Sequence, residues 1–344
     1  MKLAIHNSPR SYSDRWIRWC CDHTVDFKIV DAYSISILAD LHDCDGFLWH
    51  WQHNEAEPLL FATRLIKAVE EMGLLVFPDT ATCWHYDDKV AQKYLLEAVD
   101  APLAPVWVFY DKQAALRWVA EASWPKVWKL RRGAGSSQVK LIRSRAEAEK
   151  VIRRAFGRGW VPVERATSDV AIRFRGAGGL RGKIDLIKRA PRGLLKLAKR
   201  RKLVAPERGY FYAQEFIPRN EFDTRITVIG DRIFGFRRFV RPGDFRASGS
   251  GRIDYDASAV DLECVKIARD VAKRLRTQSC AFDFVHTPDG DPLIVEISYA
   301  YLASAIHNCA GHWNSELEWV EGPVWPEDAM IEDLVAAIER KTGR

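Results

Sequence analysis

The chain has 344 residues, of which 47% are hydrophobic and 28% charged, and its formal net charge is +6. This length and composition can bury a substantial core over two or three lobes, which excludes a disordered protein. No apolar run reaches the roughly 18 residues of a membrane span, and the first residues lack the apolar core of a signal peptide, so we expect a cytoplasmic protein. The seven scattered cysteines do not form a disulfide framework, and we expect them to be reduced.

The first part of the chain predicts a parallel sheet flanked by helices. The strand-like runs KLAIH, DFKIV, DGFLWHW and LLVFP alternate with helical stretches at 14–21, 35–41 and 59–72. Alternation of this kind is typical of βαβ units, whose ligands bind at the carboxyl ends of the strands. We expect an α/β domain over residues 1–86.

The next segments predict a small antiparallel subdomain, a basic insertion and a larger C-terminal subdomain. Over 87–156, helices alternate with the strands VWVF, PKVWKL and VKLI, and the glycine-rich loop RRGAGSSQ separates the last two strands. The insertion, 157–208, holds thirteen Lys or Arg and two acids between Arg173 and Arg208, a net charge of about +11. Residues 209–344 begin with the strands YFYAQEFI, DTRITVIG and RIFGFRRFV and continue with a helix at 258–276. A hairpin, FDFVHTPDGDPLIVEISYAY, a tryptophan-rich tail and a helix at 326–341 follow.

A lysine beside the glycine-rich loop is the first candidate for phosphate binding. Lys129 alternates with apolar residues on its strand, and the loop that follows contains Gly133, Gly135, Ser136 and Ser137. Backbone N–H groups of such a loop can close over phosphates while the lysine supplies a point charge. An ordinary hairpin with a snorkelling lysine is the alternative.

Two further stretches carry polar groups at strand ends. In YAQEFIPRNEFDTRI, an apolar run ends at Gln214 and Glu215, and Asp223 and Arg225 open the next strand. Such a crossing offers backbone groups to a flat base edge and an acid to ribose hydroxyls, although it also fits two strands joined by a polar connection.

Arg237 and Arg238 are adjacent on a strand and must point to opposite faces, so only one can serve a given site. We favour Arg238, with Arg246 and Ser248 in the loop beyond. An arginine suits a phosphoryl oxygen because its guanidinium donates two bonds at once. A solvated edge strand is the alternative.

The hairpin places two carboxylates within apolar runs. If its turn is centred on Asp289 and Gly290, Asp283 and Glu296 lie opposite each other, with Cβ atoms about 5 Å apart. A hard divalent ion such as Mg²⁺ between them would relieve their repulsion. One protonated acid, or an arginine partner such as Arg225, would do the same.

The order of these segments resembles the ATP-grasp superfamily, and within it the branch of RimK-type glutamate ligases and glutathione synthetases. The resemblance covers about 78–301, and the preceding sheet resembles a pre-ATP-grasp domain. It implies that Lys89 and Lys129 contact ATP phosphates, and that Glu215, Phe216 and Ile217, next to Gln214, bind adenine. It also implies the remaining roles: ribose at Asp223, the reacting phosphoryl group at Arg225 and Arg238, the triphosphate side at Arg246 to Ser248, and magnesium or manganese at Asp283 and Glu296.

One position departs from the family pattern. Members usually end this hairpin with Glu-x-Asn, whereas this chain has Glu296, Ile297 and Ser298. The serine hydroxyl would replace the asparagine as a metal ligand, or a water would fill the gap. The departure puts the number of metal ions in doubt more than the nucleotide.

The resemblance implies an ADP-forming carboxylate–amine ligase that acts through an acylphosphate. The tail resembles ATP-grasp proteins encoded among bacterial cell-surface polysaccharide genes, which implies a glycan carboxylate as substrate. An ATP-grasp kinase with the basic insertion as a lid for an anionic substrate, similar to inositol polyphosphate kinases, is the alternative. A non-catalytic protein that binds nucleic acid is third, because the insertion has few aromatic residues for base stacking. A homodimer is left open.

A zinc site is not expected from the histidine and cysteine spacing. His42, Cys44, His50 and His53, and again His307, Cys309 and His312, do not match the usual paired-ligand patterns.

Overall fold

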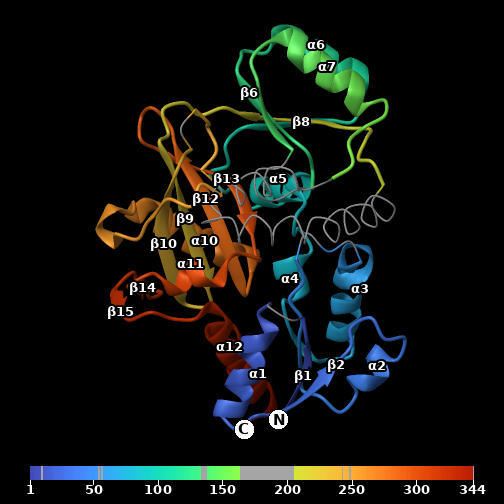
Figure 1. The fold of residues 1–344 in the computed structure, drawn as a ribbon, viewed down its shortest axis with the longest axis vertical. Helices are drawn as coiled ribbons and strands as arrows, with labels where there is room; N and C mark the ends of the chain where they lie inside the picture. The colour runs from blue at the N-terminus through green and yellow to red at the C-terminus, as the bar shows by residue number, and fades with distance from the viewer. Residues whose placement is uncertain are drawn as a thin grey trace, which may run out of the picture.

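The computed structural model describes residues 1–8, 11–52, 55, 57–132, 138–162, 205–241, 243–247 and 249–343. These residues form three sheets with their helices, as Figure 1 shows. The glycine-rich loop at 133–137, Ser248 and residues 163–204 of the basic insertion lie outside the described residues. All seven cysteines are free thiols, as expected. Within the described ranges, no helix is both long and apolar enough to cross a membrane.

The first sheet is parallel, as predicted, with the strand order β2-β1-β3-β4. Its strands are β1 (Lys2–His6), β2 (Asp26–Val30), β3 (Gly46–Leu48) and β4 (Leu75–Phe77). Its helices are α1 (Ser13–Asp22), α2 (Ile37–Asp40) and α3 (Pro58–Glu71). Alternate strand residues face opposite sides, so Leu3 and Ile5 pack on the side of α1 whereas Ala4 and Phe47 pack on the side of α3.

The last helix of the chain covers the first sheet. Helix α12 (Pro326–Thr342) packs against α1, β3 and β4 and lies beside α1 in Figure 1. A Cβ atom on Gly46 would lie only 2.8 Å from Cδ1 of Ile338, so the helix packs closely against the strand at this glycine. The two ends of the chain therefore share one hydrophobic core.

The second sheet is antiparallel, as expected, with the order β5-β8-β6-β7. Its strands are β5 (Val106–Phe109), β6 (Lys126–Lys129), β7 (Val139–Ile142) and β8 (Phe211–Glu215). Helices α6 (Lys112–Glu121) and α7 (Arg145–Ala155) are capped by the side chains of Asp111 and Ser144. Strand β8 follows the basic insertion and enters the sheet between β5 and β6, so the chain returns to the small sheet after the insertion.

The third sheet has seven strands in the order β13-β12-β9-β10-β14-β15, with β11 beside β10. The strands are β9 (Phe222–Ile229), β10 (Arg232–Phe239), β11 (Ile253–Asp254), β12 (Ser279–His286), β13 (Pro292–Ser298), β14 (Gly311–Trp313) and β15 (Trp319–Glu321). Helix α10 (Leu262–Leu275) follows a short 3-10 turn, η1 (Ala257–Ala259), and packs Cys264 and Ala268 against Phe282 and Phe284. The sequence did not predict β14, β15 or α11 (Ala303–His307), because the polar, tryptophan-rich tail around them has no clear hydrophobic periodicity.

Helix α5 (Lys89–Ala98) connects the first sheet to the second and packs against β13. It follows α4 (Thr80–Cys83), and Asp88 caps it by accepting hydrogen bonds from the backbone of Val90 and Ala91. This cap places Lys89 in the first turn, where its side chain is buried. The helix thus brings a lysine to the space between the second and third sheets (Figure 1).

Candidate functional site

One cavity of about 290 Å³ lies where α5, the second sheet and the third sheet meet. All the candidate residues that the structure describes line it. They are Lys89, Lys129, Gln214, Glu215, Phe216, Ile217, Asp223, Arg225, Arg238, Arg246, Asp283, Glu296 and Ser298. The other candidates, Gly133, Gly135, Ser136, Ser137 and Ser248, lie outside the described residues.

Two buried lysines reach the cavity from different elements. The ammonium of Lys89 lies 3.2 Å from Oε1 of Glu296, and that of Lys129 donates to the carbonyl oxygen of Val295 at 3.0 Å. Burial lowers the pKa of Lys129 to about 8, and Glu296 only partly opposes this effect. Burial acts on Lys89 too, but the nearby carboxylates of Glu296 and Asp87 outweigh it and raise the pKa of Lys89. The two lysines therefore differ in how readily they give up a proton.

A row of alternating charges crosses three strands of the third sheet. The guanidinium of Arg225 donates to both oxygens of Asp283, at 2.7 and 2.8 Å. Arg238 donates to both oxygens of Asp223, at 2.7 and 2.6 Å, and its Nη2 lies 2.8 Å from Asp283. The strand register produces the row, because Arg238 is opposite Asp223 and Asp283 is opposite Arg225. Although burial favours the neutral acid, the two guanidiniums hold the pKa of Asp283 well below its usual range.

Only one of the two adjacent arginines faces the cavity. Arg238 lines it, whereas Arg237 does not and pairs with Asp254. Strand alternation predicts this division, and the structure places Arg238 on the expected side.

Asp283 and Glu296 lie directly opposite each other, as predicted, but the hairpin reaches this register by a different route. The loop is centred on Asp289, because His286 pairs with Pro292, and regular pairing would set Asp283 opposite Val295. A bulge between the two pairs, at Val295, shifts the register and brings Glu296 into place. The carbonyl oxygen of Val295 then accepts hydrogen bonds from Lys129 and, at 3.4 Å, from Gln214.

Each acid of the hairpin has its own cationic partner in the protein. Asp283 has Arg225 and Arg238, so the arginine alternative considered for this pair is the one observed. Glu296 has Lys89, and although burial favours the neutral acid, this lysine and Lys129 lower the pKa of Glu296. Both carboxylates are therefore held in the ionised form.

The segment after β8 passes along the cavity wall. The strand ends at Glu215, whose carboxylate accepts from the buried ammonium of Lys126 at 2.8 and 2.9 Å. Phe216 and Ile217 follow beyond the last paired residue, and Asn220 binds the backbone of His286 through both ends of its amide. Phe216 and Ile217 line the cavity, and Asn220 also donates to the carbonyl oxygen of Ile217 at 3.3 Å, so this segment is held in place.

Ser298 and Arg246 both have local partners. The hydroxyl of Ser298 donates to the carbonyl oxygen of Ala300 at 2.8 Å and accepts from its N–H at 3.2 Å. Arg246 binds the carboxylate of Asp244. Ser298 therefore has one lone pair left for a further ligand.

Sequence reasoning missed several lining residues. Gln92 lies one turn beyond Lys89 on α5 and accepts from the backbone N–H of Ile297 at 3.4 Å. Its spacing of three residues from Lys89 was a usable signal, because i and i+3 share a helix face. Tyr86, Asp87, Arg219, Asn220 and Phe245 also line the cavity and had no motif to mark them.

No family model matches the chain, and no curated protein matches it. Solved structures do match over nearly its whole length. An ATP-grasp RimK domain protein from Sphaerobacter thermophilus is 17% identical, with a TM-score of 0.57 and coverage of 98% of this chain and 100% of that one. The ATP-grasp ligase PsnB, complexed with minimal precursor, Mg and ADP, is 12% identical, with a TM-score of 0.55 and coverage of 98% of each chain.

D-alanine–D-alanine ligase from Bacillus anthracis, complexed with ATP, is 12% identical, with a TM-score of 0.53 and coverage of 99% of each chain. At such identities the match establishes the architecture, and the expected mixed α/β fold class is confirmed with it. The chain therefore has the ATP-grasp fold, and the cavity lies between the second and third sheets of this fold.

Proposed function

We propose that the protein is an ATP-dependent ligase that joins a carboxylate to an amine and forms ADP. The observation that carries this proposal is the convergence of two buried lysines, two arginines and two carboxylates on one cavity that Phe216 and Ile217 also line. Buried cations such as Lys89, Lys129 and Arg238 suit a triphosphate, and backbone groups of 216–217 would suit a base edge. ATP-grasp proteins with ATP, or with Mg and ADP, among the matching structures support the same nucleotide.

The donor set fits a magnesium or manganese ion. Asp283 and Glu296 offer carboxylate oxygens from neighbouring strands. Oδ1 of Asp283 accepts from Arg225 and keeps a lone pair for a metal ion, whereas Oδ2 already meets both Arg225 and Arg238. The hydroxyl of Ser298 already donates to and accepts from the backbone of Ala300, so we favour a water rather than this hydroxyl as the third ligand of the metal ion. When bound, the ion would neutralise charge on the phosphates.

In the proposed reaction, an oxygen of the substrate carboxylate attacks the γ-phosphorus, the bond to the β-phosphate oxygen breaks, and ADP leaves. The amine then attacks the acyl carbon, phosphate leaves, and the amine gives up a proton. Lys89 and Lys129 would hold the phosphates, and Arg225 and Arg238 would stabilise charge on the transferred group. Within the described part of the chain, no cysteine or histidine lines the cavity, which agrees with a reaction that needs no protein nucleophile.

The proposal includes finer roles, namely adenine at 214–217, ribose at Asp223, triphosphate at Arg246 and at the loop residues outside the described ranges, a glycan carboxylate as substrate, and a cytoplasmic location. Both carboxylate oxygens of Asp223 already accept from Arg238, so a ribose hydroxyl would have to donate to the remaining lone pairs of these oxygens.

The experiment is a screen of glycan acids against amino acids with purified protein, ATP and Mg²⁺. We expect ADP and free phosphate in equal amounts only when a carboxylate and an amine are both present. Phosphate retained on the acceptor would instead identify a kinase. Salt-sensitive binding to random nucleic acid without nucleotide binding would identify the basic binding protein, and either result would refute the ligase.

A further inference from the structure

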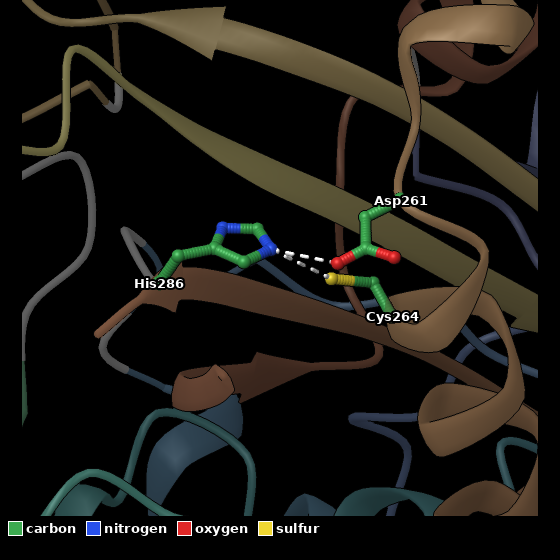
Figure 2. Close-up of side chains that lie close together, drawn as sticks. All are labelled: Asp261, Cys264 and His286. Atoms are coloured by element: carbon green, nitrogen blue, oxygen red, sulfur yellow. Dashed lines mark hydrogen bonds and ion pairs between the residues drawn. The ribbon is translucent and has the colours of Figure 1, made fainter. Parts of the chain in front are cut away.

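Three side chains of different chemistry meet on the face of the third sheet opposite the cavity. Asp261 caps α10, Cys264 lies in its first turn, and His286 ends β12 (Figure 2). Nε2 of His286 lies 2.9 Å from Oδ2 of Asp261 and 3.8 Å from Sγ of Cys264, and all three donor atoms lie within 4.8 Å of one another. We propose that this Asp–Cys–His cluster binds zinc and fastens α10 to β12.

The geometry does not fit a cysteine nucleophile. In a Cys–His–Asp triad the carboxylate holds one ring nitrogen and the thiol meets the other. Here the same nitrogen, Nε2, faces both partners, as Figure 2 shows. Cys264 is also 0% exposed, so a substrate could not reach its sulfur. Convergence of three donors on one point is instead the arrangement that a metal ion requires.

The donor atoms favour zinc over the hard ions proposed for the cavity. A thiolate and an imidazole suit zinc, whereas magnesium prefers oxygen ligands only. With bonds of about 2.0 to 2.3 Å, ligand atoms around a tetrahedral zinc lie roughly 3.3 to 3.8 Å apart. The distance of 3.8 Å between Sγ of Cys264 and Nε2 of His286 fits this range. Nε2 and Oδ2 of Asp261 are 2.9 Å apart and would have to move slightly apart to bind the same ion.

An ion could enter from solvent, because the side chains of Asp261 and His286 are 38% and 23% exposed. A water would complete four ligands, since three protein ligands and a water are a usual zinc environment. The buried thiol would form the inner wall of the site. Among the described residues this is the one group of this kind, and it contains none of the histidines considered from the sequence.

The ligands are oriented by contacts that do not involve the ion. Oδ1 of Asp261 accepts from the backbone N–H of Glu263 at 2.8 Å, which directs Oδ2 to His286. The backbone N–H of His286 donates to Oδ1 of Asn220 at 2.9 Å, and Nδ2 of Asn220 donates to the backbone carbonyl oxygen of His286 at 3.0 Å. Outer contacts that fix ligands before binding raise the affinity of a metal site.

Asn220 links this cluster to the cavity, because the same residue lines the cavity beyond the 216–217 segment. A zinc ion bound to His286 would fix the end of β12, to which Asn220 is hydrogen-bonded. The role is structural, and the inference does not depend on the ligase proposal. It predicts a metal that remains on the protein when nucleotide and magnesium are removed.

The test uses the full-length protein, purified without chelators and analysed for metal content. We expect about one zinc per chain, and after exchange for Co²⁺ we expect visible absorption of a four-coordinate ion and near-ultraviolet thiolate-to-cobalt charge transfer. Cys264→Ser should abolish the charge transfer. Asp261→Asn keeps a good helix cap and should weaken cobalt binding at least ~10-fold.

Cys309→Ser is the matched control. Its thiol is also buried but contacts the carbonyl oxygens of Gly235 and Ala305, so the cobalt spectrum should not change. Sub-stoichiometric zinc with no cobalt charge transfer would overturn the proposal and leave an ion pair beside a buried thiol. Charge transfer that persists in Cys264→Ser would overturn it as well. If Cys264→Ser does not fold, the cobalt affinity of folded Asp261→Asn protein tests the proposal, and an unchanged affinity would overturn it.

Discussion

The ammonium of Lys129 donates a hydrogen bond to the carbonyl oxygen of Val295, 3.0 Å away, at the bulge that sets Glu296 opposite Asp283. One residue of irregular pairing therefore serves two purposes in the cavity. It exposes a carbonyl oxygen that orients a buried lysine, and it places the second carboxylate on the side of the first. The cationic and acidic halves of the candidate site are positioned by the same local feature.

Nucleotide affinity should depend on the charge of Lys129. Because burial lowers its pKa to about 8, Lys129 is protonated below this pH and becomes neutral above it. We expect the affinity for ADP, measured by calorimetry, to fall as the pH rises through about 8. Lys129→Arg stays charged and should remove this fall, whereas Lys140→Arg, on an exposed position of the neighbouring strand, should keep it. An unchanged pH profile in the Lys129 variant would contradict the assignment.

Glu296 should be essential for turnover but not for folding. Glu296→Gln removes the charge that a metal ion needs, while its amide oxygen can still accept from Lys89. We expect ADP formation to drop roughly 100-fold or more, with little change in the melting temperature. Asp291→Asn, at the exposed tip of the same hairpin, should be as active as the unmodified protein. Equal activity of the two variants would refute the metal-binding role.

The two adjacent arginines should contribute very differently to stability. Arg238→Leu leaves the buried carboxylates of Asp223 and Asp283 short of a partner, which costs on the order of 3 kcal/mol or more. Arg237→Leu breaks a more exposed pair with Asp254 and should cost about 1 kcal/mol or less. Urea denaturation measures both. Similar losses for the two variants would show that the charge row does not stabilise the sheet.

Glu327 should make the protein less stable as the pH rises toward neutrality. The side chain is 6% exposed, burial raises its pKa to about 7, and its Oε2 has no hydrogen-bond partner among the described residues. The folded protein therefore binds more protons than the unfolded chain between about pH 4.5 and 7, so stability falls over this interval. Glu327→Gln should raise the free energy of unfolding by up to about 3 kcal/mol above pH 7 and have little effect at pH 4.

The control for Glu327 is its neighbour in the same helical turn. Asp328 binds Arg15 through both oxygens, so Asp328→Asn should lower stability at neutral pH rather than raise it. Thermal unfolding across pH 4 to 8 separates the two variants. A gain for Glu327→Gln that is the same at every pH would exclude titration as its cause.

Several features of the fold were predictable because they depend on local pattern. The strands β5 and β7 occupy the predicted residues, and Asp111 and Ser144 cap the helices that follow them. Alternation along β10 predicted that only one of Arg237 and Arg238 faces the cavity, and the favoured Arg238 is the one that does. In each case the signal is contained within a few neighbouring residues.

Other features had no local signal. Nothing near α12 predicts that it covers the first sheet, and nothing near β8 predicts that it enters between β5 and β6. The bulge at Val295 was missed because a bulge is a property of two paired strands. The tail elements β14, β15 and α11 lie in a polar, tryptophan-rich stretch without clear hydrophobic periodicity.

The sequence by itself determined most of the order of strands and helices, the residue types available for phosphate and metal binding, and the alternation that separates Arg237 from Arg238 on β10. Only the tertiary structure decided which cation meets which acid: Arg225 and Arg238 bind Asp283, and Lys89 binds Glu296. It also decided that His286 meets Asp261 and Cys264 behind the same sheet. The physical reason is that periodicity and capping act within a few residues, whereas these contacts join groups far apart along the chain and depend on strand register and helix packing.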